Sequence, residues 1–252
     1  KTVKAGTREV MFNVFEGLMK PTPEGDLTPA IASDYQVSED RLTYTFTLRD
    51  GVKFHNGDTV TAEDVVYSIQ RCAAATETGI VPVEAFSNIT DIQAPDASTV
   101  VITLARPYSV ALFSFAKTMI IPKSVYEEQG ADMFYQQNLV ATGPWKLEKW
   151  VDGQYAHYTK NADYWNPNYD SYYEELYVRH VLENSTAVAG HLSGDLDANL
   201  TTGGINPDML ALYSGSESRI EIVPVEVFSY YYMGFQCGEG SPFADINVRK
   251  AF

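Results

Sequence analysis

Ser114 and Lys117 have the spacing of a serine nucleophile and the lysine that activates it, Ser-x-x-Lys. Enzymes with this pair acylate the serine hydroxyl, and they complete the site with Ser-Asp-Asn and Lys-Thr-Gly motifs. The sequence contains no Ser-Asp-Asn, and Lys117-Thr118-Met119 lacks the glycine of the second motif. We interpret the pair as a chance match and keep a serine hydrolase of the SxxK type only as an alternative.

The histidines and the paired aspartates give no metal or acid–base site. No two histidines stand two, three or four positions apart, so no local pair has the spacing of zinc ligands. Asp195 and Asp197 lack both the run of oxygen ligands of a calcium loop and the opposed acid of a glycosidase. The sequence therefore predicts no catalytic residue, no metal and no cofactor. The histidines considered are His55, His157, His180 and His191.

Length and charge exclude several classes of protein. The chain has 252 residues, 45% of them hydrophobic, which is enough for one large core or two moderate cores. Its net charge of −15 should repel nucleic acid and anionic membrane surfaces. No apolar run approaches the ~20 residues that cross a bilayer. Since no export signal appears either, we expect that one was trimmed from the chain.

The two cysteines, Cys72 and Cys237, stand far apart and form no zinc or redox motif. Cys72 continues an apolar stripe with Val65 and Ile69, so we expect it to be a small buried side chain. Two positions in a sequence do not decide whether a disulfide joins them.

Residues 42–71 give the clearest local structure. Apolar residues alternate with threonines over 42–48, which predicts a half-buried strand. Two turn dipeptides with glycine follow, at 50–51 and 56–57. Thr61 then has the position of a helix N-cap, and the acidic Glu63 and Asp64 suit the positive end of a helix.

Other elements follow from the same patterns. Apolar spacing predicts helices over 8–19, 123–129, 185–192, 207–215 and 246–252, with Ser185 and Gly194 bounding the third. Strands are predicted over 99–104, 145–150, 154–159, 176–182, 220–225 and 229–236. The stretch 110–121 reads as a short helix followed by a strand that ends at Pro122.

Several motifs in order resemble the family 5 extracellular solute-binding proteins, the peptide and nickel receptors of ABC importers. The longest lies over 42–71, LTYTFTLRDGVKFHNGDTVTAEDVVYSIQR. Shorter ones are Glu16-Gly17-Leu18, Thr142-Gly-Pro-Trp145, Asn161-Ala-Asp-Tyr-Trp165, Ser193-Gly-Asp-Leu-Asp197 and Pro242-Phe-Ala-Asp-Ile-Asn-Val-Arg. Each motif alone is weak, and their shared order carries the resemblance.

The resemblance implies an α/β fold of mixed α+β type, the first lobe of a type II periplasmic binding protein, in which helices flank a mixed sheet. The first lobe would occupy residues 1–235. Within it, subdomain Ib would take about 20–165, and subdomain Ia about 1–19 and 166–235. Residues 236–252 would begin a truncated second lobe.

The resemblance also places a solute site between the lobes. We expect ligand contacts from Tyr230, Tyr231, Tyr232 and Gln236, on the strand that crosses between lobes, and from Thr118 and Met119. Neighbouring residues of a strand face opposite sides, so Tyr230 and Tyr232 share one face and Tyr231 takes the other.

The implied function is the capture of oligopeptides or dipeptides for an ABC permease, without catalysis. The implied protein is a monomer, periplasmic or extracellular, with a lipid anchor as an alternative. A nickel, haem or sugar receptor on the same fold is the alternative function. An isolated lobe supplies one wall of the site, so we expect it to bind no tighter than roughly millimolar.

Overall fold

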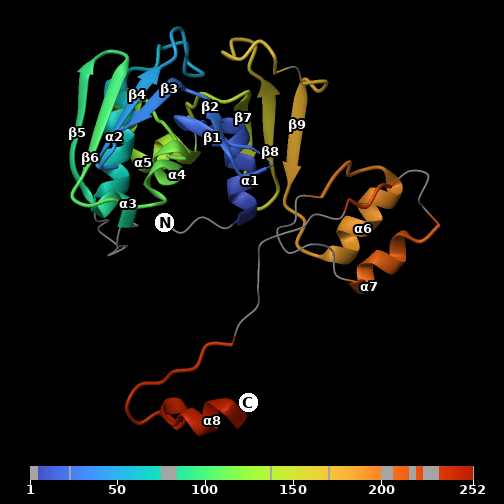
Figure 1. Ribbon diagram of the computed structural model, residues 1–252. Helices are drawn as coiled ribbons and strands as arrows, with labels where there is room; N and C mark the ends of the chain where they lie inside the picture. The colour runs from blue at the N-terminus through green and yellow to red at the C-terminus, as the bar shows by residue number, and fades with distance from the viewer. Residues whose placement is uncertain are drawn as a thin grey trace.

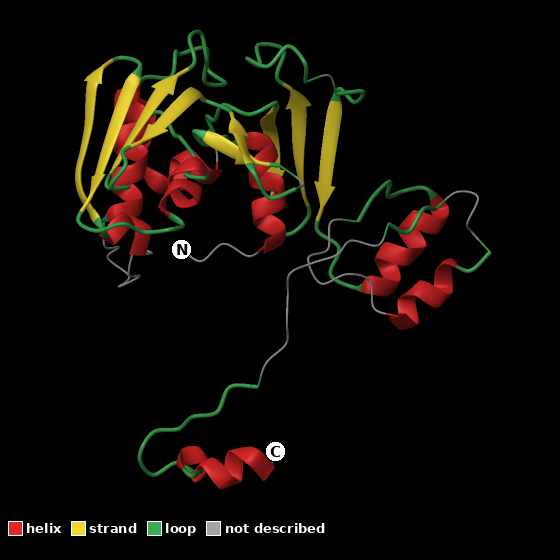
Figure 2. Cartoon of the chain, in the orientation of Figure 1, coloured by secondary structure: helices red, strands yellow, loops and turns green. Residues whose placement is uncertain are grey.

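The computed structural model describes residues 5–22, 24–74, 84–136, 138–169, 171–199, 207–215, 220–223 and 233–251. Figure 1 shows a four-stranded sheet with several helices, and beside it a three-stranded sheet. In Figure 2 the helices α2 to α5 gather on one side of the larger sheet. The predicted combination of sheets and helices is confirmed.

The larger sheet has the strand order β3-β4-β6-β5, and its pairings are antiparallel. Its strands are β3 (Ala32–Val37), β4 (Thr43–Leu48), β5 (Ile89–Asp96) and β6 (Thr99–Leu104). The predicted strands over 42–48 and 99–104 are confirmed. The alternation of β4 turns Tyr44, Phe46 and Leu48 into the core, while its threonines stay at least partly accessible.

The outer and inner strands of this sheet differ in regularity. The inner pair β4 and β6 keeps one register from Thr43 to Thr47. The outer strand β3 has a break in register between Ala32 and Asp34, and the outer strand β5 has two breaks, one of them between Ile89 and Asp91. Bulges of this kind occur often at sheet edges.

Helix α2 (Ala62–Ala73) begins at the predicted N-cap. The Thr61 side chain accepts a hydrogen bond from the backbone N–H of Asp64, and the Asp64 carboxylate accepts one from the backbone N–H of Thr61. This reciprocal pair is a capping box. Val65 and Ile69 are buried as predicted. The prediction that Cys72 is buried in this stripe is wrong, since its side chain is exposed.

Three helices follow in the same layer: α3 (Glu84–Ser87), α4 (Ala111–Ala116) and α5 (Lys123–Gln136). The helix predicted from residue 123 is confirmed, and it continues past a break at Gly130, where φ is 75°. The strand predicted to end at Pro122 is wrong, because residues 118–122 have no regular secondary structure. Two of their backbone N–H groups bond elsewhere: that of Ile120 to the carbonyl oxygen of Glu16, and that of Ile121 to the Ser68 hydroxyl.

Helix α1 (Ala5–Val14) is shorter than predicted, since apolar spacing had extended it to residue 19. A Cβ on Gly17 would lie 2.0 Å from the carbonyl oxygen of Ala116. The chain therefore leaves the helix to pass closely against the end of α4. It then forms β1 (Met19–Pro21), which pairs with β2 (Leu27–Pro29).

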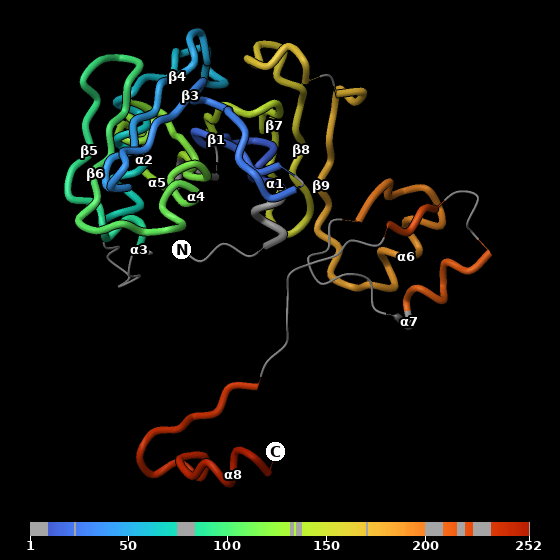
Figure 3. The backbone as a smooth tube through the Cα atoms, viewed as in Figure 1, coloured from blue at the N-terminus to red at the C-terminus, as the bar shows by residue number. Residues whose placement is uncertain are grey.

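The smaller sheet contains β7 (Trp145–Val151), β8 (Tyr155–Lys160) and β9 (Glu175–Arg179) in sequence order, all antiparallel. The predicted hairpin over 145–159 is confirmed, and its turn glycine, Gly153, has a φ of 68°. Helix α1 packs against β7, as the tube in Figure 3 also shows, although the two lie far apart in the sequence.

The remaining elements are α6 (Asn184–Ser193), α7 (Pro207–Leu210), η1 (Ala211–Tyr213), η2 (Pro242–Ala244) and α8 (Ile246–Ala251). Gly194 ends α6 in the left-handed conformation, as predicted, but the N-cap is Glu183 and not Ser185. Residues 220–223 are not in a strand, contrary to the prediction. No helix among the described residues is long and apolar enough to span a bilayer.

The two sheets and their helices share one hydrophobic core. It joins residues of α1, of the larger sheet, of α2, α4 and α5, and of the β7–β8 hairpin. The largest fully buried side chains in it are Phe46, Phe115, Phe134, Leu18, Met19, Ile31, Ile69, Ile102 and Ile120.

Candidate functional site

Glu16 is a buried carboxylate just beyond the end of α1. Its side chain accepts a hydrogen bond of 2.5 Å from the Tyr164 hydroxyl and one of 2.6 Å from the indole N–H of Trp165. Burial raises the pKa of Glu16, and the two donors oppose that rise. A buried charge is tolerated only when such partners compensate it. The carboxylate therefore fixes the loop after β8 against the end of α1.

A cation lies over the ring of Trp165. The guanidinium carbon of Arg49 is 4.3 Å from the centroid of the indole ring. The same side chain donates a hydrogen bond of 3.2 Å to the carbonyl oxygen of Ala30. Arg49 also lowers the pKa of Glu16 through its charge. The larger sheet and the loop after β8 are thus joined through an aromatic ring.

Gly143 lies where three segments meet. Its N–H donates to the carbonyl oxygen of Val14 at 2.8 Å. Its own carbonyl oxygen lies 3.0 Å from Nε2 of His55 and accepts a bond of 3.1 Å from the Asn161 side chain. Burial lowers the pKa of His55 to about 4, so the imidazole is neutral and Nε2 carries the proton that it donates. A Cβ on Gly143 would lie 2.5 Å from the oxygen of Val14.

These contacts bring separate motifs of the sequence together. Residues 16–18, 142–145 and 161–165 form one hydrogen-bonded group, which we call the motif junction. Within it, the Thr142 hydroxyl accepts a hydrogen bond of 3.2 Å from the backbone N–H of Glu16. The junction is built from main-chain bonds and buried side chains, so its role is to hold the surrounding segments in place.

The segment after α4 is one of those held in place. The N–H of Ile120 donates to the carbonyl oxygen of Glu16 at 3.1 Å. The N–H of Ile121 donates to the Ser68 hydroxyl at 3.0 Å. Residues 118–121 are therefore tied on one side to the motif junction and on the other to α2.

Two predicted ligand residues lie in this segment. Thr118 is buried, and its hydroxyl donates a hydrogen bond of 3.1 Å to the carbonyl oxygen of Ser114 in the preceding helix α4. Met119 is half-buried and packs against the core. The structure thus turns the Thr118 side chain into the protein and leaves part of Met119 at the surface.

Ser114 and Lys117 have different partners. The Ser114 hydroxyl donates to the carbonyl oxygen of Val110 at 3.1 Å. The Lys117 ammonium lies 4.0 Å from the centroid of the Phe113 ring. The Ser114 hydroxyl is thus engaged with the backbone at the start of α4.

The other predicted ligand residues are Tyr230, Tyr231, Tyr232 and Gln236. Tyr230, Tyr231 and Tyr232 lie outside the described residues. Gln236 is exposed, and its carbonyl oxygen accepts a bond of 2.5 Å from the Ser241 hydroxyl, within its own segment. None of the hydrogen bonds between described residues brings Gln236 to Thr118 or Met119.

The sequence of the chain decides its family. Residues 26–252 match the family described as bacterial extracellular solute-binding proteins, family 5, over its middle region. The chain belongs to this family. The motif junction thus joins three of the stretches that resemble motifs of family 5.

Curated relatives in family 5 are peptide-binding proteins by name. A putative ABC transporter peptide-binding protein of Brucella ovis is 30% identical, over 88% of this chain and 41% of its own. The periplasmic oligopeptide-binding protein OppA of Haemophilus influenzae is 28% identical over 100% of this chain and 49% of its own. A probable D,D-dipeptide-binding periplasmic protein of Escherichia coli is 35% identical over 69% and 33%. The chain spans less than half the length of these relatives.

Solved structures of family 5 have the same fold. NikZ from Campylobacter jejuni, in complex with Ni(L-His), matches with a TM-score of 0.71 at 28% identity, over 82% of this chain and 41% of its own. Haemophilus influenzae OppA in complex with the peptide RPPGFSPFR matches with a TM-score of 0.74 at 24% identity, over 86% and 45%. The chain therefore has part of the type II periplasmic-binding-protein fold.

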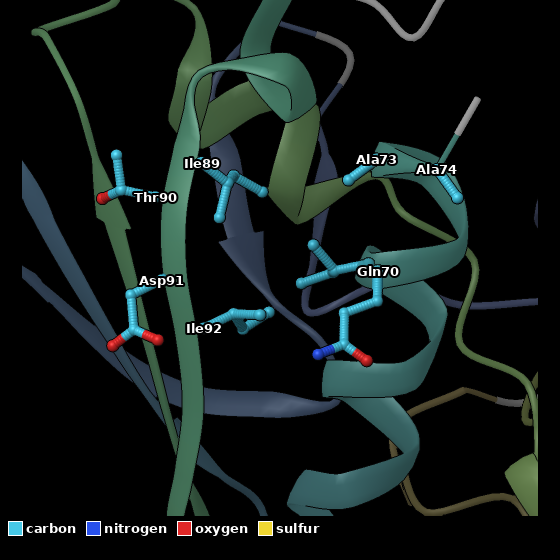
Figure 4. Close-up of a pocket in the computed structure, with 8 residues that line it drawn as sticks. Gln70, Ala73, Ala74, Ile89, Thr90, Asp91 and Ile92 are labelled. Carbon is cyan, nitrogen blue, oxygen red and sulfur yellow. The ribbon is translucent and has the colours of Figure 1, made fainter.

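A pocket of about 420 Å³ opens on another face of this family 5 chain, between α2 and β5. Figure 4 shows Gln70 and Ala73 on the helix facing Ile89 and Ile92 on the strand, while Asp91 points away. None of the predicted ligand residues lines it. The described residues also contain no group of three or more His, Cys, Asp or Glu side chains that could hold a metal ion.

Proposed function

We propose that this chain forms one wall of the solute site of a substrate-binding protein of an ABC importer, which captures oligopeptides or dipeptides and passes them to a permease. The single observation that carries the proposal is the match of residues 26–252 to family 5. The curated relatives with peptide-binding names support the choice of peptides. The proposed protein binds and releases its solute without chemical change.

The proposed site is a cleft whose near wall includes residues 118–119, with Tyr230, Tyr231, Tyr232 and Gln236 completing it. Peptide main chain offers the same donors and acceptors whatever its side chains are, so a wall that reads backbone can accept many sequences. Closure of the second lobe then buries the solute. In this proposal Met119 gives apolar contact, and Thr118 acts through its backbone.

The proposed setting is outside the cytoplasmic membrane. The protein would act as a monomer, periplasmic or extracellular, with a lipid anchor as an alternative to free diffusion. The net charge of −15 disfavours adhesion of this chain to anionic lipid.

Mass spectrometry of solute that copurifies with the full-length protein tests the function directly. Peptides recovered from the folded protein, followed by calorimetric binding with a micromolar or lower dissociation constant, would support the proposal. A full-length protein that carries no peptide and binds none from a random peptide mixture would overturn it.

A nickel receptor is the second candidate, and the likeness to NikZ in complex with Ni(L-His) is the observation that favours it. Calorimetry of the full-length protein with Ni(L-His) and with peptides separates the two. Tight binding of the nickel complex without peptide binding would replace the first proposal with the second. Haem and sugars are tested in the same way.

A further inference from the structure

Asn56 is followed directly by a glycine, and no other Asn-Gly dipeptide occurs in the sequence. This dipeptide is the asparagine sequence most prone to deamidation, because a glycine has no side chain to hinder attack by its backbone nitrogen on the neighbouring amide. The proposed function makes no use of it. Whether Asn56 reacts depends on how the surrounding turn holds it.

A short hairpin turn presents the dipeptide to water. The N–H of Phe54 donates to the carbonyl oxygen of Asp58 at 2.8 Å and closes the turn. Asn56, Gly57 and Asp58 are exposed, whereas Phe54 is buried. Gly57 has a φ of 93°, in the left-handed region that glycine tolerates. The reacting groups therefore lie at the surface, on a turn that Phe54 anchors in the core.

Both reacting groups are engaged in hydrogen bonds while the turn is closed. The Gly57 N–H, which must lose its proton to become a nucleophile, donates to the carbonyl oxygen of Phe54 at 2.9 Å. The Asn56 amide is held by Asp58: its Nδ2 donates to the carboxylate at 2.6 Å, and its Oδ1 accepts from the backbone N–H at 3.1 Å. Deprotonation of Gly57 and loss of Nδ2 break two of these three bonds, so the reaction needs the turn to open.

His55 ties the same turn to the motif junction. Its backbone N–H donates to the carbonyl oxygen of Ala141 at 2.7 Å, and its Nε2 lies 3.0 Å from the carbonyl oxygen of Gly143. Opening of the turn therefore has to compete with contacts to a second segment of the chain. Local openings of this kind are rarer where more such contacts must break.

We propose that Asn56 is a site of spontaneous deamidation, and that opening of the turn over residues 54–58 sets its rate. The nitrogen of Gly57 forms a bond to Cγ of Asn56, the bond from Cγ to Nδ2 breaks, and ammonia leaves with the proton that Gly57 has lost. Water then adds to a carbonyl carbon of the cyclic imide and cleaves the bond from that carbon to the ring nitrogen. The product is aspartate or isoaspartate, and nothing is oxidised or reduced.

The product places a negative charge where Asn56 has a donor. A carboxylate replaces the amide that bonds to the Asp58 carboxylate at 2.6 Å, so two like charges face each other within one turn. Their repulsion favours the open turn and weakens the hold on His55. The reaction thus removes the structure that had slowed it, whatever solute the protein binds.

The test measures deamidation of the full-length protein at mildly alkaline pH, folded in buffer and unfolded in guanidinium chloride. Digestion and mass spectrometry quantify the conversion of amide to acid at each asparagine. In the unfolded protein Asn56 should react fastest of the asparagines, and in the folded protein its rate should be lower by about tenfold or more. The ratio of the two rates measures the protection by the turn, because the intrinsic reactivity of the dipeptide cancels.

Asp58→Ala removes the carboxylate that holds the Asn56 amide, and it should lower this protection by about threefold or more. The matched control is Asp50→Ala, at the exposed aspartate of the other turn dipeptide, which should leave the protection unchanged. Asn56→Asp has the charge of the product, whereas Asn56→Ser removes the amide without adding charge. Hydrogen exchange of the Gly57 N–H should be faster in Asn56→Asp than in Asn56→Ser.

Three results would overturn the proposal. Equal rates in the folded and the unfolded protein would show that the turn sets no rate. Equal protection in Asp58→Ala and in the wild type would show that the bonds to the Asn56 amide do not protect it. Faster conversion at another asparagine of the unfolded protein would contradict the choice of Asn56. Equal hydrogen exchange in Asn56→Asp and Asn56→Ser would refute the effect of the product on the turn.

Discussion

Glu16 and Trp165 are 149 residues apart in the sequence and are joined by a hydrogen bond of 2.6 Å from the indole N–H to the carboxylate. The bond ties the end of α1 to the loop that follows the β7–β8 hairpin. Because Ile120 bonds to the backbone of the same glutamate, the proposed solute wall depends on this contact.

Replacing Glu16 by Gln should destabilise the protein by about 2–4 kcal/mol. The glutamine amide places an N–H₂ group where Glu16 has an acceptor oxygen. Either the Tyr164 hydroxyl or the Trp165 indole N–H then loses its acceptor. Chemical denaturation measures the change. The matched control is Glu39→Gln at an exposed site, which should stay within about 0.5 kcal/mol of the wild type. Equal effects at the two positions would contradict the role given to Glu16.

Stability should fall as the pH is lowered from neutral, and His55 should account for part of the fall. Burial lowers its pKa from 6.5 to about 4 in the folded protein, so the unfolded chain takes up the proton first. The contribution of neutral His55 to the free energy of unfolding is fully present above pH 6.5 and is lost as the pH falls toward 4. Between about pH 7.5 and pH 5 the loss is about 2 kcal/mol.

The variant His55→Gln tests this assignment, since its amide can still donate to the carbonyl oxygen of Gly143. Denaturation at both pH values should show a smaller loss in the variant than in the wild type. The raised pKa of Glu16 acts in the opposite direction, because that carboxyl takes up its proton in the folded state first. An unchanged loss in His55→Gln would show that other groups carry the pH dependence.

Adding one methyl group to Gly17 or Gly143 should prevent normal folding or cost several kcal/mol, about 3 or more. The new Cβ would lie 2.0 Å from the oxygen of Ala116 in the first case and 2.5 Å from that of Val14 in the second. Both obstacles are backbone atoms, which cannot turn aside. Thermal melts should show Gly238→Ala near wild type, since its nearest neighbour would be at 3.6 Å.

The capping box of α2 offers a graded pair of variants. Thr61→Ala removes one cap and should cost about 1 kcal/mol. Asp64→Ala should cost more, about 2–3 kcal/mol, because that carboxylate also accepts a bond of 2.9 Å from the backbone N–H of Lys123 at the start of α5. Urea titrations of the two variants measure the order. A smaller cost for Asp64→Ala than for Thr61→Ala would refute it.

Local patterns in the sequence predict an element correctly where the separate signals of that segment favour the same structure. The strand over 42–48 and the helix after Thr61 are correct because alternation, turn glycines and cap all favour one structure. Strand β3 was missed, since Ala32–Val37 mixes polar and apolar residues and is extended through its pairing with β4. Helix α1 was overextended because nothing local shows that Gly17 must pass against Ala116.

The predicted ligand residues rest on the resemblance to family 5 and on no local pattern of the sequence. Thr118 and Met119 were placed beside the cleft by resemblance, yet no local signal shows that the Thr118 hydroxyl turns back to Ser114. The contact between Lys117 and Phe113 follows from their separation of one helical turn, which the sequence does contain.

The outer strands of the larger sheet limit how these proteins meet each other. A second copy can extend a sheet only along a straight row of unpaired N–H and C=O groups. The pairing of β3 and of β5 with its inner neighbour breaks register, at one point in the first and at two in the second, while the inner pair is regular. Such bulges bend a strand and twist its outer edge out of a straight row. Polymerisation by strand addition should therefore be disfavoured even where the protein is crowded.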